Sequence, residues 1–85
     1  MTHEELLQYA QRKSFEPFRL LLTTGETFDI RHPELIMVGR RSAIIGVTNE
    51  PNVTAYERTI KVDLLHVVGI EELPVSPPSS NGAAT

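Results

Sequence analysis

Two runs of alternating apolar residues, 18–22 and 26–31, constrain the fold of this chain more than any other feature, and Thr23-Thr24-Gly25 separates them. Alternate residues of a β-strand share one face. A two-residue turn would put the two apolar sets on opposite faces, which sacrifices the buried face. A three-residue turn pairs Leu20 with Phe28 and gives the glycine the left-handed position that such a turn needs. The sequence therefore predicts an antiparallel hairpin with a three-residue turn.

A short helix is predicted before this hairpin. Thr2 and Glu5 have the spacing of a capping box, in which the hydroxyl and the carboxylate satisfy free amides at the helix start. An apolar stripe follows at Leu6, Leu7 and Ala10. The helix should end by Ser14, because Pro17 biases the preceding residue away from helical angles. A helix of two to three turns is marginal alone, so it must pack against the strands.

The rest of the chain predicts three more strands. Pro33 interrupts the second strand with a bulge or a bend, because proline cannot donate to a ladder, and the strand resumes at 35–38. Further strands are expected at 43–48, 56–62 and 66–72, with Asp63-Leu64-Leu65 as a tight turn. The predicted fold is mainly β with one N-terminal α-helix, its five strands forming a strongly bent antiparallel sheet or a small barrel.

Residues 1–73 are predicted to form a single domain, and residues 74–85 a disordered tail rich in Pro and Ser. A domain of about 60 residues buries only about 60% of its unfolded surface, and this chain has no cysteine to add a disulfide. Apolar residues also remain on the outer face, namely Leu21, Val67, and either Leu35 and Met37 or Ile36 and Val38. We therefore expect a homo-oligomer that forms through edge strands.

Composition argues against several function classes. The formal net charge is −3, so the chain as a whole lacks the basic footprint of a nucleic-acid binder. No apolar run approaches the roughly 18 residues of a membrane span, and the start of the chain is acidic where a signal peptide would be basic. The lack of cysteine is typical of a cytoplasmic protein. We expect a cytoplasmic protein that does not contact a membrane.

No catalytic or metal-binding pattern is evident. His3, His32 and His66 fall in three predicted elements without metal-ligand spacing, so no metal site is predicted. The carboxylates are not paired in a catalytic geometry, the serines lack a nucleophile context, and no phosphate loop is present. We expect no enzyme activity, no catalytic residue and no cofactor.

A local group of arginines is the candidate site. If the turn at 39–42 folds back towards Arg31, then Arg31, Arg40 and Arg41 together could contact phosphate. The alternative is a solvated hairpin tip. Tyr56 is the sole aromatic residue expected nearby, whereas platforms for single-stranded nucleic acid present several.

The helix, the hairpin Leu20-Leu21-Leu22-Thr23-Thr24-Gly25-Glu26-Thr27-Phe28 and the closing Val67-Val68-Gly69-Ile70-Glu71-Glu72 resemble the Sm-like fold, a small barrel of the SH3-like kind. That fold includes the bacterial host-factor RNA chaperone and the Sm proteins. The resemblance implies a ring in which the fourth strand of one subunit pairs with the fifth strand of the next. The RNA-binding motifs of the family do not carry over: segment 32–37 lacks its Asp and Asn, and 63–65 lacks its Arg-Gly or Lys-Gly.

A second resemblance is more specific. Pro17-Phe18-Arg19-Leu20, together with the segment 28–34, resembles a family of small uncharacterised bacterial proteins associated with planctomycetes. This resemblance covers most of the predicted domain and implies kinship, but it carries no established activity.

Two functions follow as hypotheses. The first is a non-catalytic, self-associating small-barrel interaction module. The alternative is an Sm-like binder of single-stranded RNA that uses Arg31, Arg40 and Arg41. A protein or peptide partner that adds a strand at an open edge is compatible with the first hypothesis.

Overall fold

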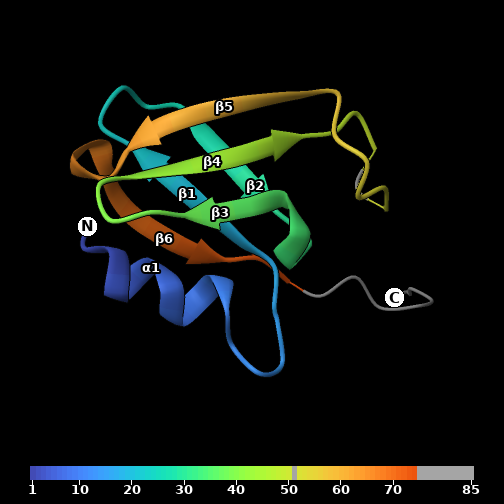
Figure 1. Ribbon diagram of the computed structural model, residues 1–85, viewed down its shortest axis with the longest axis horizontal. Helices are drawn as coiled ribbons and strands as arrows, with labels where there is room; N and C mark the ends of the chain where they lie inside the picture. The colour runs from blue at the N-terminus through green and yellow to red at the C-terminus, as the bar shows by residue number, and fades with distance from the viewer. Residues whose placement is uncertain (51, 75–85) are drawn as a thin grey trace.

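The computed structural model describes residues 1–50 and 52–74, and it folds them into a helix, six strands and two short 3₁₀ helices (Figure 1). The elements are α1 (His3–Ala10), β1 (Phe18–Leu22), β2 (Thr27–Ile30), η1 (Pro33–Leu35), β3 (Ile36–Val38), β4 (Ser42–Val47), β5 (Arg58–Asp63), η2 (Leu64–His66) and β6 (Val67–Glu72). The predicted tail beyond Pro74 lies outside the described residues.

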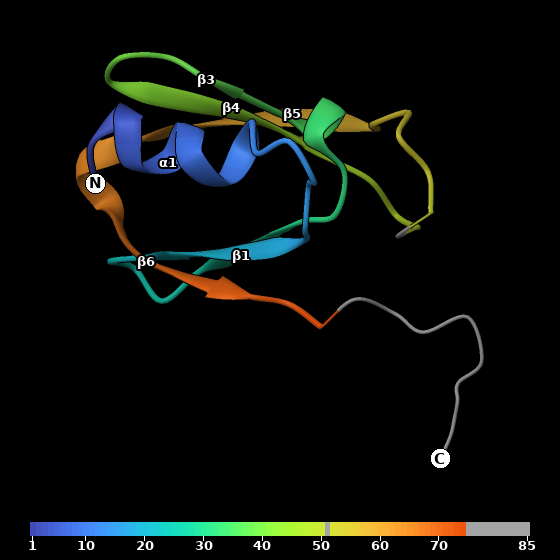
Figure 2. The same ribbon diagram turned by 90° about the horizontal axis from the view of Figure 1, so that it is seen from below.

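The strands form two antiparallel sheets of three. The first sheet has the order β2-β1-β6 and the second sheet the order β3-β4-β5. Figure 2 shows them as two layers, with α1 lying between the layers on one side. The prediction of a mainly β fold with one N-terminal helix is confirmed. The prediction of one five-stranded bent sheet or small barrel is wrong, because the strands divide between two sheets.

Two tight turns cause this division. Pro33 begins η1, in which the Leu35 amide donates to the His32 carbonyl at 3.1 Å, so the predicted long second strand is two strands in different sheets. Proline has no amide hydrogen for a ladder, and the 3₁₀ turn does not need one at that position. Further along, η2 separates β5 from β6, and the Asp63 carboxylate caps it by accepting from the Leu65 amide at 3.0 Å.

The predicted hairpin register is confirmed. Phe18 lies opposite Ile30, and Leu20 lies opposite Phe28. The Gly25 amide donates to the Leu22 carbonyl at 2.9 Å, and Gly25 has φ +91°, the left-handed conformation that favours glycine. A three-residue turn thus keeps the apolar side chains of both strands on one face.

The helix begins and docks as expected. Thr2 and Glu5 form the capping box in both directions. Leu6 is fully buried, and the Tyr9 ring lies 5.8 Å from the Phe18 ring, centroid to centroid. The helix ends at Ala10, before the predicted limit at Ser14.

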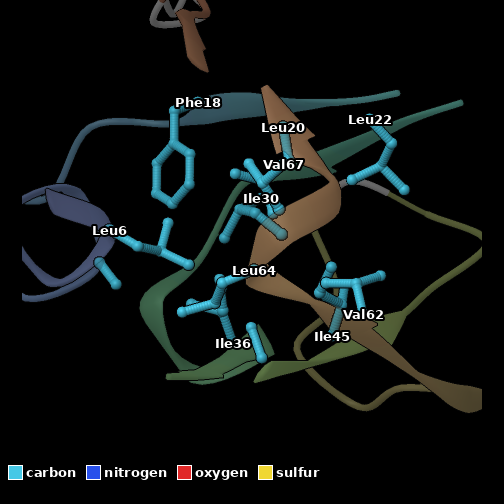
Figure 3. Close-up of a cluster of buried hydrophobic side chains, with 12 residues drawn as sticks. Leu6, Phe18, Leu20, Leu22, Ile30, Ile36, Ile45, Val62, Leu64 and Val67 are labelled. Carbon is cyan, nitrogen blue, oxygen red and sulfur yellow. The ribbon is translucent and has the colours of Figure 1, made fainter. Parts of the chain in front are cut away.

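The hydrophobic core lies between the sheets and beside the helix, from which Leu6 projects into it (Figure 3). Its largest fully buried side chains are Phe18, Leu6, Leu20, Ile30, Ile45 and Val67. The burial of Val67 corrects its predicted place on the outer face. The pairing of β1 with β6 shifts register between Leu21 and Leu22, and this irregularity puts Val67 opposite the core residue Leu22.

Candidate functional site

The three predicted site arginines lie in two places. Arg40 and Arg41 are exposed in the turn between β3 and β4, whereas Arg31 follows β2 and precedes η1. The β3–β4 turn and η1 are at opposite ends of β3 and of the molecule (Figure 1). The turn does not fold back towards Arg31, so these residues do not form one basic patch.

Arg31 belongs to a row of charges on the outer face of the first sheet. Its Nη2 lies 3.5 Å from Oδ2 of Asp29. Arg19 donates from Nε to Oδ1 of Asp29 at 2.7 Å and from Nη1 to Oε1 of Glu71 at 3.4 Å. The hydrogen bond from Arg19 is the main cause of a lowered Asp29 pKa, and the charges of Arg19 and Arg31 add to it. The charge of Arg31 is therefore partly neutralised by Asp29 of the same chain.

Arg40 and Arg41 are in a different electrostatic position. Neither forms an ion pair within the described part of the chain. They line a depression of about 320 Å³ together with Met1, Asp63 and η2. The Met1 ammonium donates to the carbonyls of Leu64 at 3.1 Å and Val67 at 3.4 Å, which adds a positive charge there. The depression is consequently lined by three positive charges and by one carboxylate, that of Asp63.

A larger cleft lies at the opposite end. It has a volume of about 420 Å³ and runs between β2 and the end of β4. Phe28, Leu35 and Val47 contribute apolar surface, and Asp29 and Arg31 contribute charged groups. Sequence reasoning did not find this cleft, because its walls come from strands of different sheets and no local pattern marks it.

The outer face of the second sheet is apolar. Met37 and Ile44 lie opposite each other, and their exposed fractions are 67% and 40%. Tyr56, 58% exposed, covers Gly46 on the same sheet. Met37 was one of the predicted outer-face residues, whereas Leu35 is buried in η1.

The four edge strands differ in their surroundings. β3 contacts α1, and β2 borders the large cleft. β5 and β6 do not pair with each other in the described structure. Ile60 on β5 and Ile70 on β6 are half-buried although both pack against the core, and Val68 is 64% exposed. These two strands therefore present main-chain groups and apolar side chains at open edges.

Among residues 1–50 and 52–74, no three His, Cys, Asp or Glu side chains are grouped so that they could hold a metal ion. His66 is exposed in η2, where its Nδ1 lies 3.3 Å from Oγ1 of Thr23. None of the helices in this part of the chain has the length and apolar character that a membrane crossing requires.

Comparisons with protein-family models, with curated proteins and with solved structures found no match. The two resemblances drawn from the sequence stay predictions.

Proposed function

We propose that this protein is a non-catalytic interaction module that self-associates by pairing β5 of one copy with β6 of the next. One observation carries the proposal: β5 is an edge strand of one sheet and β6 an edge strand of the other, and within the described residues no strand pairs with either outer edge. Unpaired edges of this kind are templates for another chain. Pairing would satisfy main-chain groups and would bury the half-exposed Ile60 and Ile70.

The charges favour pairing of unlike edges. β5 carries Arg58 and Lys61, whereas β6 ends in Glu71 and Glu72, which lie 3.4 Å from Arg19 and 3.7 Å from Arg12 of the same copy and would be shared with the partner strand. Two β5 edges, or two β6 edges, would bring like charges together, and this costs free energy. A contact between unlike edges is heterologous, and repeated contacts of this kind close into a ring or extend as a filament.

Size-exclusion chromatography with light scattering at tens of micromolar tests this function, and Lys61→Pro is the sharpest variant. The Leu64 amide donates to the Arg41 carbonyl at 2.8 Å, so bonding to β4 continues at Val62 and Ile60, and the Lys61 amide points to the open edge. Lys61→Pro should give monomers. The control Lys61→Val keeps the amide and should stay oligomeric. A monomeric wild type would contradict the proposal.

Binding of single-stranded RNA is a second candidate, and the absence of ion pairs at Arg40 and Arg41 within the described residues favours it. A gel shift at low and moderate salt tests it, because phosphate contacts weaken steeply with salt. The double variant Arg40→Ala/Arg41→Ala should abolish the shift. Arg31→Ala is the matched control and should retain it, since Arg31 is already paired with Asp29. No shift at low salt would end this candidate.

A further inference from the structure

The cleft between β2 and the end of β4 borders the open edge of β2. The Leu22 amide donates to the Glu26 carbonyl at 3.0 Å, which fixes where bonding between β1 and β2 begins. In an antiparallel pair, bonded positions alternate along the strand. Bonding to β1 therefore continues at Phe28 and Ile30, and the residues between them direct their amides and carbonyls away from β1.

These outward positions are Thr27, Asp29 and the following Arg31, and all three line the cleft. A strand added to β2 would bond to them. Its intervening side chains would point to the core side of the sheet, as the side chain of Phe28 does. On that side the cleft offers apolar surface from Phe28, Leu35 and Val47. The cleft thus combines an open row of main-chain groups with an apolar pocket beside it, the two features of strand-addition sites.

The surroundings of the cleft are acidic. The acidic residues that line the cleft or adjoin its lining residues are Glu26, Asp29, Glu34, Glu50 and Glu57. Asp29 lines the cleft, three of the others adjoin lining residues in the chain, and the Glu57 amide donates to the Val47 carbonyl at 2.8 Å. The nearby basic residues are fewer: Arg19 and Arg31, which are both paired with Asp29, and Arg58, opposite Val47. A ligand with positive charge at its ends is electrostatically favoured.

We propose that the cleft binds an extended, basic peptide as a fourth strand of the first sheet, with apolar side chains at alternate positions entering the cleft and basic residues at the flanks. This site is separate from β5 and β6, on which the proposed self-association rests. A volume of about 420 Å³ lies within the range of ligand pockets in proteins and suits one or two apolar side chains.

Fluorescence anisotropy with a labelled peptide, Lys-Thr-Val-Thr-Val-Thr-Lys, tests the proposal on the full chain. We expect saturable binding. Replacing the central Thr of the peptide by Pro removes one main-chain donor and should weaken binding about tenfold. Replacing both Lys by Glu should weaken it by a similar factor of about ten, and salt should reduce this difference.

Two protein variants locate the site. Thr27→Pro removes an outward amide but no bond to β1, and it should weaken binding about tenfold, whereas Thr27→Val should change it less than about twofold. The exposed pair Glu34→Gln/Glu50→Gln, which does not touch the ladder, should reduce the preference for Lys over Glu at the peptide ends. Circular dichroism checks that each variant is folded.

The same samples separate this proposal from self-association. Thr27→Pro should keep the oligomeric state of the wild type, and Lys61→Pro should bind the peptide as the wild type does. Absence of saturable binding, equal binding of the proline peptide, or full binding by folded Thr27→Pro would overturn the peptide site. None of these results bears on pairing between β5 and β6.

Discussion

The two sheets face solvent with opposite chemistry. At the centre of the first sheet, Arg19 lies directly opposite Asp29 on one side and Glu71 on the other, and it bonds both carboxylates. At the centre of the second sheet, Ile44 lies between Met37 and Lys61. A three-strand charge row therefore occurs in one sheet, and a largely apolar row in the other.

This difference shows which face is complete in a single copy. The first sheet satisfies its central charges with its own side chains, so a partner on that face would have to displace ion pairs. The second sheet leaves apolar side chains exposed. Covering a continuous apolar surface of this kind with a partner would lower the free energy of the complex. The following experiments test the contrast.

Each sheet has a glycine on its outer face, Gly46 in the second sheet and Gly69 in the first. Substituting these glycines by alanine should give the largest difference in stability between the two sheets. A Cβ at Gly46 would lie 3.0 Å from Cβ of Tyr56 and 3.2 Å from Cδ2 of the buried Leu35. At Gly69 it would lie 3.1 Å from Cδ1 of Leu21, the far end of a flexible side chain. Gly46→Ala should lower the free energy of unfolding by about 2 kcal/mol, and Gly69→Ala by less than about 0.5 kcal/mol, because alanine also suits a strand better than glycine.

Urea unfolding followed by circular dichroism measures both variants. A loss of unfolding free energy for Gly46→Ala as small as the loss for Gly69→Ala would contradict the prediction. It would show that Tyr56 and Leu35 can move aside and that the outer face of the second sheet is packed less tightly than its geometry indicates.

The charge row should be the next largest contribution. Arg19→Gln leaves Asp29 and Glu71 without their shared cation and should lower the free energy of unfolding more than any other substitution in the row. Arg31→Gln is the matched control, since it removes a single 3.5 Å contact with Asp29, and should cost about 0.3 kcal/mol. Unfolding at low and high salt checks the cause, because salt should narrow the difference. A larger loss of unfolding free energy for Arg31→Gln than for Arg19→Gln would show that Arg19 is not the main cation of the charge row.

Acid should weaken the first sheet through Asp29. Its folded-state pKa is lowered, so the carboxylate contributes stability that is present above its unfolded pKa and is lost as pH falls below about 4 towards the lowered value. Asp29→Asn should be less stable at neutral pH and should lose less stability in this acid range. The pKa of Glu5 is also lowered, chiefly by the hydrogen bond from the Thr2 amide. Because Glu5 is unchanged in the variant, part of the loss of stability in acid should remain. Parallel pH profiles for both proteins would contradict this assignment.

The smallest effect is expected on the apolar face. Met37 is 67% exposed, so Met37→Gln should change the free energy of unfolding by less than about 0.5 kcal/mol. The measurement is made at two protein concentrations. A loss above about 1 kcal/mol that grows with concentration would mean that a second copy covers this face.

Local features of this fold were predictable from the sequence. The hairpin register follows from the spacing of Leu20 and Phe28 around a glycine turn, and the capping box follows from Thr2 and Glu5. Each depends on residues close together in the chain, where the geometry allows few solutions.

Features that join distant segments were not predictable. Pro33 is compatible with a bend within one strand or with a break between two, and only the packing of both sheets selects the break. The burial of Val67 depends on an irregular pairing with Leu22, far away in the chain. The separation of the site arginines and the position of the cleft were unpredictable for the same reason: the direction of the turn at Arg40 decides whether it meets Arg31, and the β2 cleft needs β4 as its second wall.

The place of β6 beside β1 has a consequence for the order of events during synthesis. The second sheet consists of strands that follow one another along the chain, so its pairs can close soon after they leave the ribosome. The first sheet must wait, because Arg19 and Glu71 are 52 residues apart. Contacts of such long sequence separation close slowly. Until β6 emerges, β1 has a single neighbour, and the apolar underside of the hairpin is open to chaperones and to other nascent chains.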